Sequence, residues 1–196
     1  LARLAVKLLK SDNAPKYITC LETYNTEKIE DIAKKENLES KISVVKPTDP
    51  LKLSFQDKSF DIVYAGWIPS ELLRNEDYLQ ELARVSKKDI VFIMSGLNGD
   101  IPALRDLILK EDESQRRKEL RNFLTNYFTK NGYQTDTSRE TTLRLDFPNL
   151  QTIFDTFHYF DFRNNLNKKN QEKLKKYLEL KMHNFKDDLY IFHAWK

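Results

Sequence analysis

The sequence predicts an α/β fold, a mostly parallel, doubly wound sheet with helices on both of its faces. Helical and strand patterns alternate along the first half of the 196-residue chain. The strand segments are short and almost entirely apolar, which is typical of strands buried on both sides. Neighbouring parallel strands need a crossover connection, usually a helix, so this alternation favours a parallel sheet.

The elements of the first half follow from residue periodicity and from end signals. The predicted elements are, in order, a helix at 1–10, a strand at 17–21, a helix at 25–38, strands at 41–45 and 60–66, a helix at 75–88 and a strand at 89–96. Asn25 or Thr26 is expected to cap the second helix, and the third begins at Asn75 or Glu76, because polar and acidic groups suit a helix N-terminus. Between 45 and 60 the chain must form a short helix or a long loop.

The second half carries longer and more highly charged helices. Its predicted elements are a helical stretch at 101–133, strand material at 132–147, an aromatic-rich helix at 150–162, a basic helix at 167–185 and a final strand at 188–196. We interpret residues 1–196 as a single domain in which 100–185 are candidates for a helical lid or cap over the strand ends. The basic helix has apolar residues at helical spacing, which predicts a solvated helix with one packed face.

Composition limits the classes of function. Lysine and arginine number 33 against 30 acidic residues, and a net charge of +3 does not by itself indicate nucleic acid or an anionic membrane. No apolar run approaches the ~20 residues that span a bilayer. Cys20 is the single cysteine, so neither a disulfide framework nor a cysteine-based metal site is expected, and a reducing, cytoplasmic setting fits best. The three histidines lack metal-ligand spacing, so no metal is expected.

Two acidic residues follow predicted strands, where open α/β sheets bind their ligands. Glu22 ends the strand at 17–21, and its carboxylate could accept hydrogen bonds from both hydroxyls of a ribose. The alternative is a helix N-terminal acid ahead of 25–38. Asp49 could accept from the exocyclic amine of an adenine, and its alternative is a turn residue before Pro50.

Three stretches carry a resemblance to a known family. They read YITCLET, TDPLKLSFQDKSFDIVYA and YLQELARVSKKDIVFIMSG, at residues 17–23, 48–65 and 78–96. Glu22 follows the strand at 17–21, and Asp49 follows the strand at 41–45. A loop with apolar residues comes next, and Ser59-Phe60-Asp61 leads into the strand at 60–66. In this respect the chain resembles the seven-stranded, class I S-adenosylmethionine-dependent methyltransferases over residues 1–96.

The resemblance implies a cofactor site. Glu22 would bind the ribose hydroxyls of S-adenosylmethionine, and Thr23 would flank the ribose or adenine. Asp49 would meet the adenine amine. The segment from Ala65 through Gly66 and Trp67 would face the methionine end and the methyl acceptor. Asp61 is a family marker with a structural role.

Two departures from the family pattern change these expectations. The Gly-rich loop that would precede residues 1–10 is absent, and the four glycines, at 66, 96, 99 and 132, cannot replace it. We expect that the loop precedes Leu1 in a longer chain; the alternative is a cofactor-free relative. Pro50 has no N–H to offer adenine, which shifts that contact to Leu51.

The acceptor is less readable than the cofactor. The segment after 60–66 lacks the Asn/Asp-Pro-Pro-aromatic motif, and Cys20 lies inside a strand, so nucleic-acid methylation is not indicated. His158 is a candidate general base, with a packed histidine as the alternative. We expect a methyltransferase that acts on a small molecule. An inactive methyltransferase-like module that binds a protein partner is the alternative, and RNA or protein methylation, resting on the basic helix, is the third.

Overall fold

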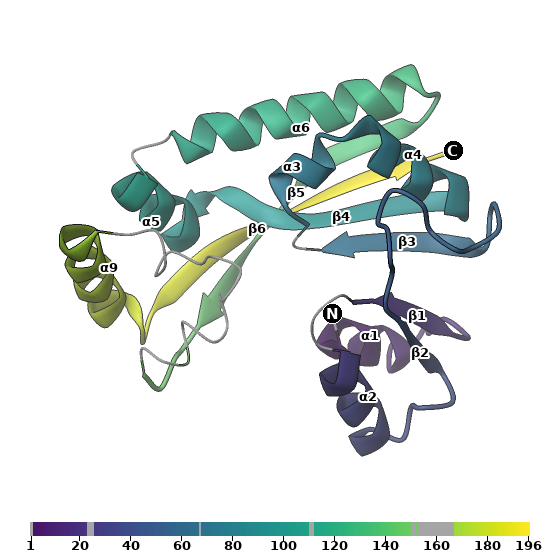
Figure 1. The fold of residues 1–196 in the computed structure, drawn as a ribbon, viewed down its shortest axis with the longest axis horizontal. Coiled ribbons are helices and arrows are strands. Elements are labelled where there is room, and N and C mark those ends of the chain that lie inside the picture. Colours follow the sequence, from purple (N-terminus) through teal and green to yellow (C-terminus); the bar gives the residue numbers. More distant parts are fainter. Residues whose placement is uncertain (1, 23–25, 67, 110–111, 150–151, 153–166) are drawn as a thin grey trace. The chain divides into compact units, whose positions relative to one another are not determined.

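The computed structural model describes residues 2–22, 26–66, 68–109, 112–149, 152 and 167–196 (Figure 1). The chain forms two compact units, Leu1–Gln56 and Asp57–Lys196, which are described separately. The interpretation of 1–196 as one domain stays a prediction. Among the described residues, no helix combines the length and the apolar character needed to cross a membrane.

The first unit is a two-stranded parallel sheet covered by two helices. Its elements are α1 (Ala2–Leu9), β1 (Ile18–Leu21), α2 (Thr26–Lys35) and β2 (Ile42–Val45). The strands pair in register from Ile18 opposite Ile42 to Leu21 opposite Val45. The core consists of buried side chains from both helices, both strands and the turn after α2: Ala5, Leu9, Cys20, Ile29, Ala33, Leu38 and Ile42. Because the strands are parallel, both finish at the same edge of the sheet.

The second unit contains a four-stranded sheet in the order β3-β4-β6-β5. Its elements are β3 (Phe60–Gly66), α3 (Ser70–Leu73), α4 (Glu76–Val85), β4 (Ser86–Gly99), α5 (Asp100–Leu109), α6 (Glu113–Lys130), β5 (Gln134–Leu145), α9 (Lys168–Lys181) and β6 (Phe185–Trp195). Figure 1 shows α6 lying along the sheet, where Phe128 packs against Phe92 and Phe192. These three rings are fully buried and form the centre of this core.

The sheet of the second unit is mixed, which corrects the expectation of a mostly parallel sheet. β3 and β4 are parallel, whereas β6 runs antiparallel to both β4 and β5. The physical reason is the long connection from 146 to 184, which carries α9. It returns the chain at the end of the sheet where β5 finishes, so β6 must run back in the opposite direction. The α/β fold with flanking helices is confirmed.

Most predicted elements are present, with shifted ends. Asn75 caps α4, since its side-chain oxygen accepts from the N–H groups of Asp77 and Tyr78. The helical stretch predicted at 101–133 is two helices, and Asp112 caps the second of them. The short helix α3 was not predicted. The described segment between β2 and β3 is a long loop with turns.

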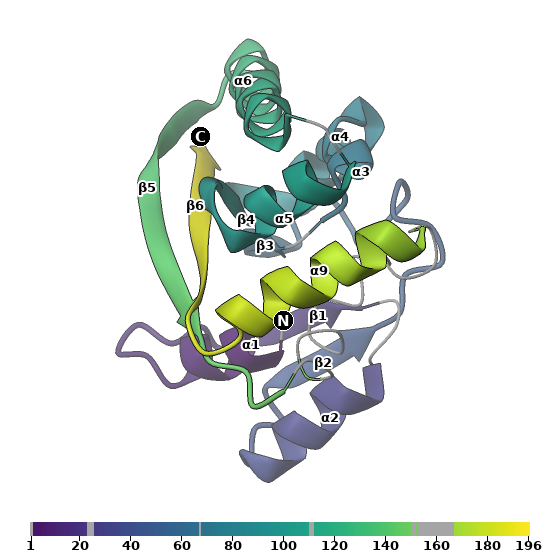
Figure 2. The same ribbon diagram turned by 90° about the vertical axis from the view of Figure 1, so that its left-hand side faces the viewer.

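α5 and α9 lie beside each other at the end of the sheet where β4 finishes and β6 begins (Figure 2). Their shared core contains Ile101, Leu104, Leu174 and Leu178 together with Phe147 and Phe185. The basic helix therefore has the packed face that its periodicity predicts. A lid role for residues 100–185 stays a prediction, and nearly all of the aromatic segment at 150–162 lies outside the described residues.

Candidate functional site

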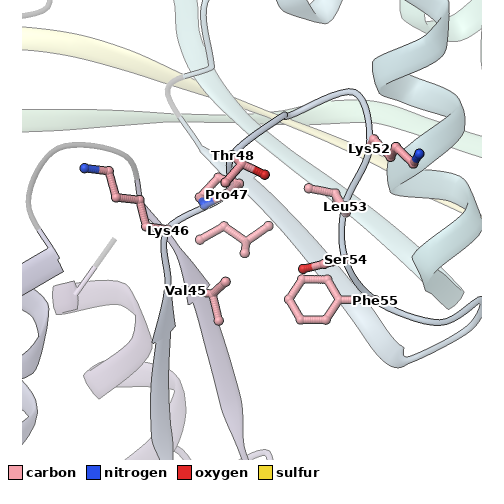
Figure 3. Close-up of a pocket in the computed structure, with 9 residues that line it drawn as sticks. Val45, Lys46, Pro47, Thr48, Lys52, Leu53, Ser54 and Phe55 are labelled. Atoms are coloured by element: carbon pink, nitrogen blue, oxygen red, sulfur yellow. The ribbon is translucent and has the colours of Figure 1, made fainter.

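A pocket of about 90 Å³ lies at the carboxyl ends of β1 and β2, within the first unit (Figure 3). Leu21 and Val45, the last residues of the two strands, are register neighbours and form its floor. The loop that follows β2 folds back over them. The pocket is lined by Leu21, Val45, Lys46, Pro47, Thr48, Lys52, Leu53, Ser54 and Phe55.

The loop turns back because Asp49 organises a turn. Asp49 Oδ1 accepts a hydrogen bond of 2.8 Å from the N–H of Leu51, and its carbonyl oxygen accepts one of 3.2 Å from Lys52 N–H. Short acidic side chains commonly bond the backbone two residues on in this way. After the turn, Leu53 is only 7% exposed and points inward.

The pocket lining mixes apolar side chains with polar groups, among them Thr48 and Ser54. Figure 3 shows the side chains of Leu53 and Phe55 projecting from the loop toward Val45. The ammonium groups of Lys46 and Lys52 point away from the interior, so their stems contribute mainly apolar surface. Small-molecule sites typically combine such apolar walls with a small number of polar groups. An aromatic side chain such as Phe55 can stack on a flat ring.

Glu22 lies at the same strand end as this pocket. It directly follows Leu21, and its N–H donates to Val45 O at 3.1 Å, which extends the β1–β2 pairing by one step. The residue is half-buried. A carboxylate one residue beyond the pocket floor can accept two hydroxyl hydrogen bonds from a ligand that reaches past the rim.

The structure places the other predicted residues less favourably. Asp49 is exposed, and the Leu51 N–H that was expected to meet adenine already donates to Asp49. Ala65 is buried and Gly66 half-buried at the end of β3, where they pair with Phe92 and Ile93 in the second unit. Thr23, Trp67 and His158 lie outside the described residues.

Sequence reasoning did not include the pocket walls among the site residues. Leu53 and Phe55 entered only as markers of the family pattern. A signal was present, because three large apolar residues, Leu51, Leu53 and Phe55, alternate with polar ones in the loop that follows Pro47 and Pro50. In the part of the chain that the structure describes, no three His, Cys, Asp or Glu side chains come together as a metal site would require.

Comparison with known proteins identifies the part of the chain that contains this pocket. Residues 4–94 match the family model described as a methyltransferase domain. The matched stretch, just under half of the chain, is thus similar to the methyltransferase domain family. The resemblance read from the three sequence stretches is thereby confirmed. The match also supports S-adenosylmethionine as the cofactor.

Solved structures show the same fold across most of the chain. The YcgJ protein from Bacillus subtilis is 14% identical, with a TM-score of 0.57, covering 93% of this chain and 83% of its own. A candidate methyltransferase from Bacillus halodurans C-125 is also 14% identical, with a TM-score of 0.53 and coverage of 92% and 83%. No curated protein matches the sequence.

A third structure separates the fold from the reaction. The [4+2]-cyclase SpnF is 14% identical, with a TM-score of 0.51, and covers 94% of this chain and 67% of its own. Its name states a cyclisation, so likeness to this fold does not decide what is done with a bound ligand. The reaction of the present protein must therefore be argued from its own residues.

Proposed function

We propose that the protein is an S-adenosylmethionine-dependent methyltransferase for a small-molecule acceptor, and that the pocket at the ends of β1 and β2 holds the adenosine part of the cofactor. The observation that carries this proposal is the position of the pocket. It lies at the carboxyl ends of two parallel strands, inside the matched methyltransferase domain, with Glu22 beside its floor. When bound, the cofactor supplies an already activated methyl group.

The residues present fit the chemistry of adenosine. Leu21, Val45, Leu53 and Phe55 offer apolar walls to the ring. Glu22 accepts the two ribose hydroxyls, and charge assistance strengthens both bonds. Asp49 holds the loop in place through one oxygen, and as a carboxylate it has capacity for a further donor such as the adenine amine.

The remaining predicted contacts stay part of the proposal. Thr23 would flank the ribose, and Ala65, Gly66 and Trp67 would face the methionine end and the acceptor. Leu51 is proposed as a contact of the ring through its side chain, which is 36% exposed, since its N–H is used by Asp49. His158 is the candidate for removing a proton from the acceptor where the reaction requires it.

A small-molecule acceptor is favoured over a macromolecule by the near-balanced charge of +3 and by the sequence after β3, which lacks the base-methylating motif. Cys20, buried in the core of the first unit, is a free thiol, which suits the proposed cytoplasmic setting. Burial raises the pKa of this thiol, so it is not poised as a nucleophile.

The proposal is tested by calorimetry of the full-length protein with S-adenosylhomocysteine. Binding with a dissociation constant in the micromolar range, weakened by substitution of Glu22, is the expected result. A complete absence of heat at millimolar ligand would rule out the interpretation as a methyltransferase. It would favour the alternative, an inactive module that binds a partner protein. Transfer of an isotope-labelled methyl group into the protein or RNA fraction of a cell extract, instead of the small-molecule fraction, would overturn the proposed acceptor class.

A further inference from the structure

The carboxyl end of β4 carries buried charged groups that the proposed adenosine pocket does not use. Asp187, near the start of β6, is 2% exposed, and Asp100, the first residue of α5, is 5% exposed. β4 and β6 are antiparallel, and Asp187 is the register partner of Gly99. Both groups belong to the second unit, and they surround the segment Ser95–Gly99.

The carboxyl group of Asp187 packs against the backbone of this segment. The β4–β6 register shifts between Ser95 and Gly99, so the intervening residues bulge out of the ladder. Gly99 has a φ of +127°, and a Cβ atom on it would lie 3.1 Å from Asp187 Oδ1. The Ser95 side chain hydrogen-bonds the same carboxyl group, while Oδ1 has no hydrogen-bond partner among the described residues. Asp187 therefore touches both ends of the bulged segment.

α6 holds the segment from its other side. Arg117 Nη1 donates to the carbonyl oxygen of Gly96 at 2.7 Å, and Ser114 Oγ donates to that of Leu97 at 3.0 Å. Arg117 Nε also pairs with Glu113 at 3.0 Å. The guanidinium is thus the nearby cation for Asp187, and it is already engaged by a backbone carbonyl and by a second carboxylate.

Asp100 links α5 to α9 and to β6 next to this segment. It accepts from Tyr177 Oη at 2.6 Å and from Lys186 N–H at 2.7 Å, and it pairs with Lys181 at 3.1 Å. The charged groups that act on Asp187 are thus Arg117, Asp188 and Asp100. Glu113 is the partner of Arg117, Lys181 is the partner of Asp100, and Lys186 is the neighbour of Asp187 in β6. Burial raises the pKa of Asp187 to about 7, Asp188 and Asp100 add to the rise, and Arg117 and Ser95 oppose it.

We propose that Asp187 is a positioning residue for the Ser95–Gly99 end of β4, and that its proton decides how firmly this segment is held. The neutral acid packs against Gly99 without burying a charge. The ionised carboxylate, buried without sufficient compensation, is drawn toward Arg117 and competes with Gly96 and Glu113 for the guanidinium. The segment is therefore held at acidic pH and loosened above neutrality.

The consequence for ligands rests on the proposed function. In open α/β sheets the carboxyl ends of the parallel strands line the ligand site, and Ser95–Gly99 is such an end. Loosening it by deprotonation of Asp187 weakens binding of the methyl acceptor as the pH rises through 7.

Hydrogen exchange on the ligand-free, full-length protein tests the positioning role. Protection factors of the amides at 95–99, corrected for intrinsic exchange, are expected to fall at least tenfold between pH 6 and pH 8. Asp187→Asn mimics the neutral acid and should keep them constant. Asp61→Asn is the control, since that exposed carboxylate pairs with Lys87 near the starts of β3 and β4, away from residues 95–99, and it should behave as the unsubstituted protein. Equal protection at both pH values, or the same loss in Asp187→Asn, would overturn the proposal.

A second measurement does not depend on any variant folding. The carbon-13 signal of the Asp187 carboxyl group should titrate with a midpoint near neutral pH, and a midpoint below pH 5 would contradict the proposal. S-adenosylhomocysteine affinity measured over the same pH range separates the two proposals. Absence of binding at every pH with intact pH-dependent protection would defeat only the proposed function. Binding with pH-independent protection would defeat only the role of Asp187.

Discussion

Asp49 Oδ1 accepts a 2.8 Å hydrogen bond from the N–H of Leu51, so the carboxylate predicted to meet adenine is also the group that shapes the pocket loop. These two roles separate by substitution. Asp49→Asn keeps a side-chain oxygen for the turn, whereas Asp49→Ala removes it. We expect Asp49→Ala to lower the free energy of unfolding by about 0.5–1.5 kcal/mol, the contribution of one hydrogen bond. Asp49→Asn should leave it unchanged.

The same pair of variants decides whether the charge of Asp49 matters for the cofactor. If the carboxylate meets the adenine amine, Asp49→Asn should weaken S-adenosylhomocysteine binding with no effect on urea unfolding. If Asp49 is only a turn residue, Asp49→Asn should bind as tightly as the unsubstituted protein, and the predicted adenine contact would be wrong.

Glu22→Ala should weaken S-adenosylhomocysteine binding by about 1.5–3 kcal/mol, because hydrogen bonds to a charged acceptor are lost. Isothermal calorimetry measures this change. The matched control is Glu27→Ala, which removes an exposed acid from the first turn of α2 in the same unit. Glu27→Ala should alter helix stability slightly and leave binding unchanged. An identical dissociation constant in Glu22→Ala would show that Glu22 is only a helix-end acid.

Phe55→Ala should weaken the same ligand by about 1–3 kcal/mol, the range found for stacking of a base on an aromatic side chain. Phe55→Leu keeps apolar volume but loses the flat ring, so its affinity for the ligand should lie between those of Phe55→Ala and the unsubstituted protein. Tyr17→Ala removes an aromatic residue that is 63% exposed in the same unit and lies outside the pocket lining, so it serves as the control. Equal affinity in Phe55→Ala would place the adenine elsewhere.

The stability of the second unit should depend on pH through Asp187. The folded-state pKa is raised to about 7, whereas an unfolded aspartate titrates near 3.9. The folded state therefore binds the proton more tightly than the unfolded state. The resulting contribution of Asp187 to the free energy of unfolding is fully present below about pH 4. It is lost as the pH rises to about 7 and stays absent above that. The loss is on the order of 4 kcal/mol for a shift of this size.

Fluorescence-detected unfolding measures this dependence, since both tryptophans, Trp67 and Trp195, belong to the second unit. Asp187→Asn should flatten the stability profile between pH 4 and pH 7 and be the more stable protein at pH 8. A profile in Asp187→Asn that falls with pH as steeply as before would assign the titration to another group.

Sequence patterns were sufficient for the elements whose packing is local. The periodicity of residues 1–10 and 25–38 and the short apolar runs at 17–21 and 41–45 correspond to α1, α2, β1 and β2. Ala5 and Leu9 of α1 and Ile29 and Ala33 of α2, which recur at helical spacing, lie in the core of the first unit. Glu22 was predicted at the strand end because a carboxylate directly after a buried strand interrupts its apolar pattern.

Relationships between distant residues were not readable in the same way. The antiparallel course of β6 depends on where a connection of almost 40 residues returns, which no local pattern records. The partnership of Asp187 with Gly99 joins positions 88 apart in the sequence, and only the β4–β6 register brings them together. The hydrogen bond from Leu51 N–H to Asp49 is local, but the sequence was equally compatible with a hydrogen bond from the same N–H to adenine.

The two glycines with positive φ in the second unit should respond differently to alanine. Gly132 has a φ of +78° and nothing within 4 Å of an added Cβ, so Gly132→Ala should cost about 1 kcal/mol of conformational strain. Gly99 has a φ of +127°, and an added Cβ would lie 3.0 Å from both Asp187 Cα and Asp188 N. Backbone atoms cannot swing aside, so Gly99→Ala adds steric strain to conformational strain and should destabilise by at least twice as much. Urea unfolding monitored by tryptophan fluorescence compares the two variants directly. Equal destabilisation would mean that β4 and β6 separate at this point without difficulty, and that the close approach of Asp187 to Gly99 contributes little to the fold.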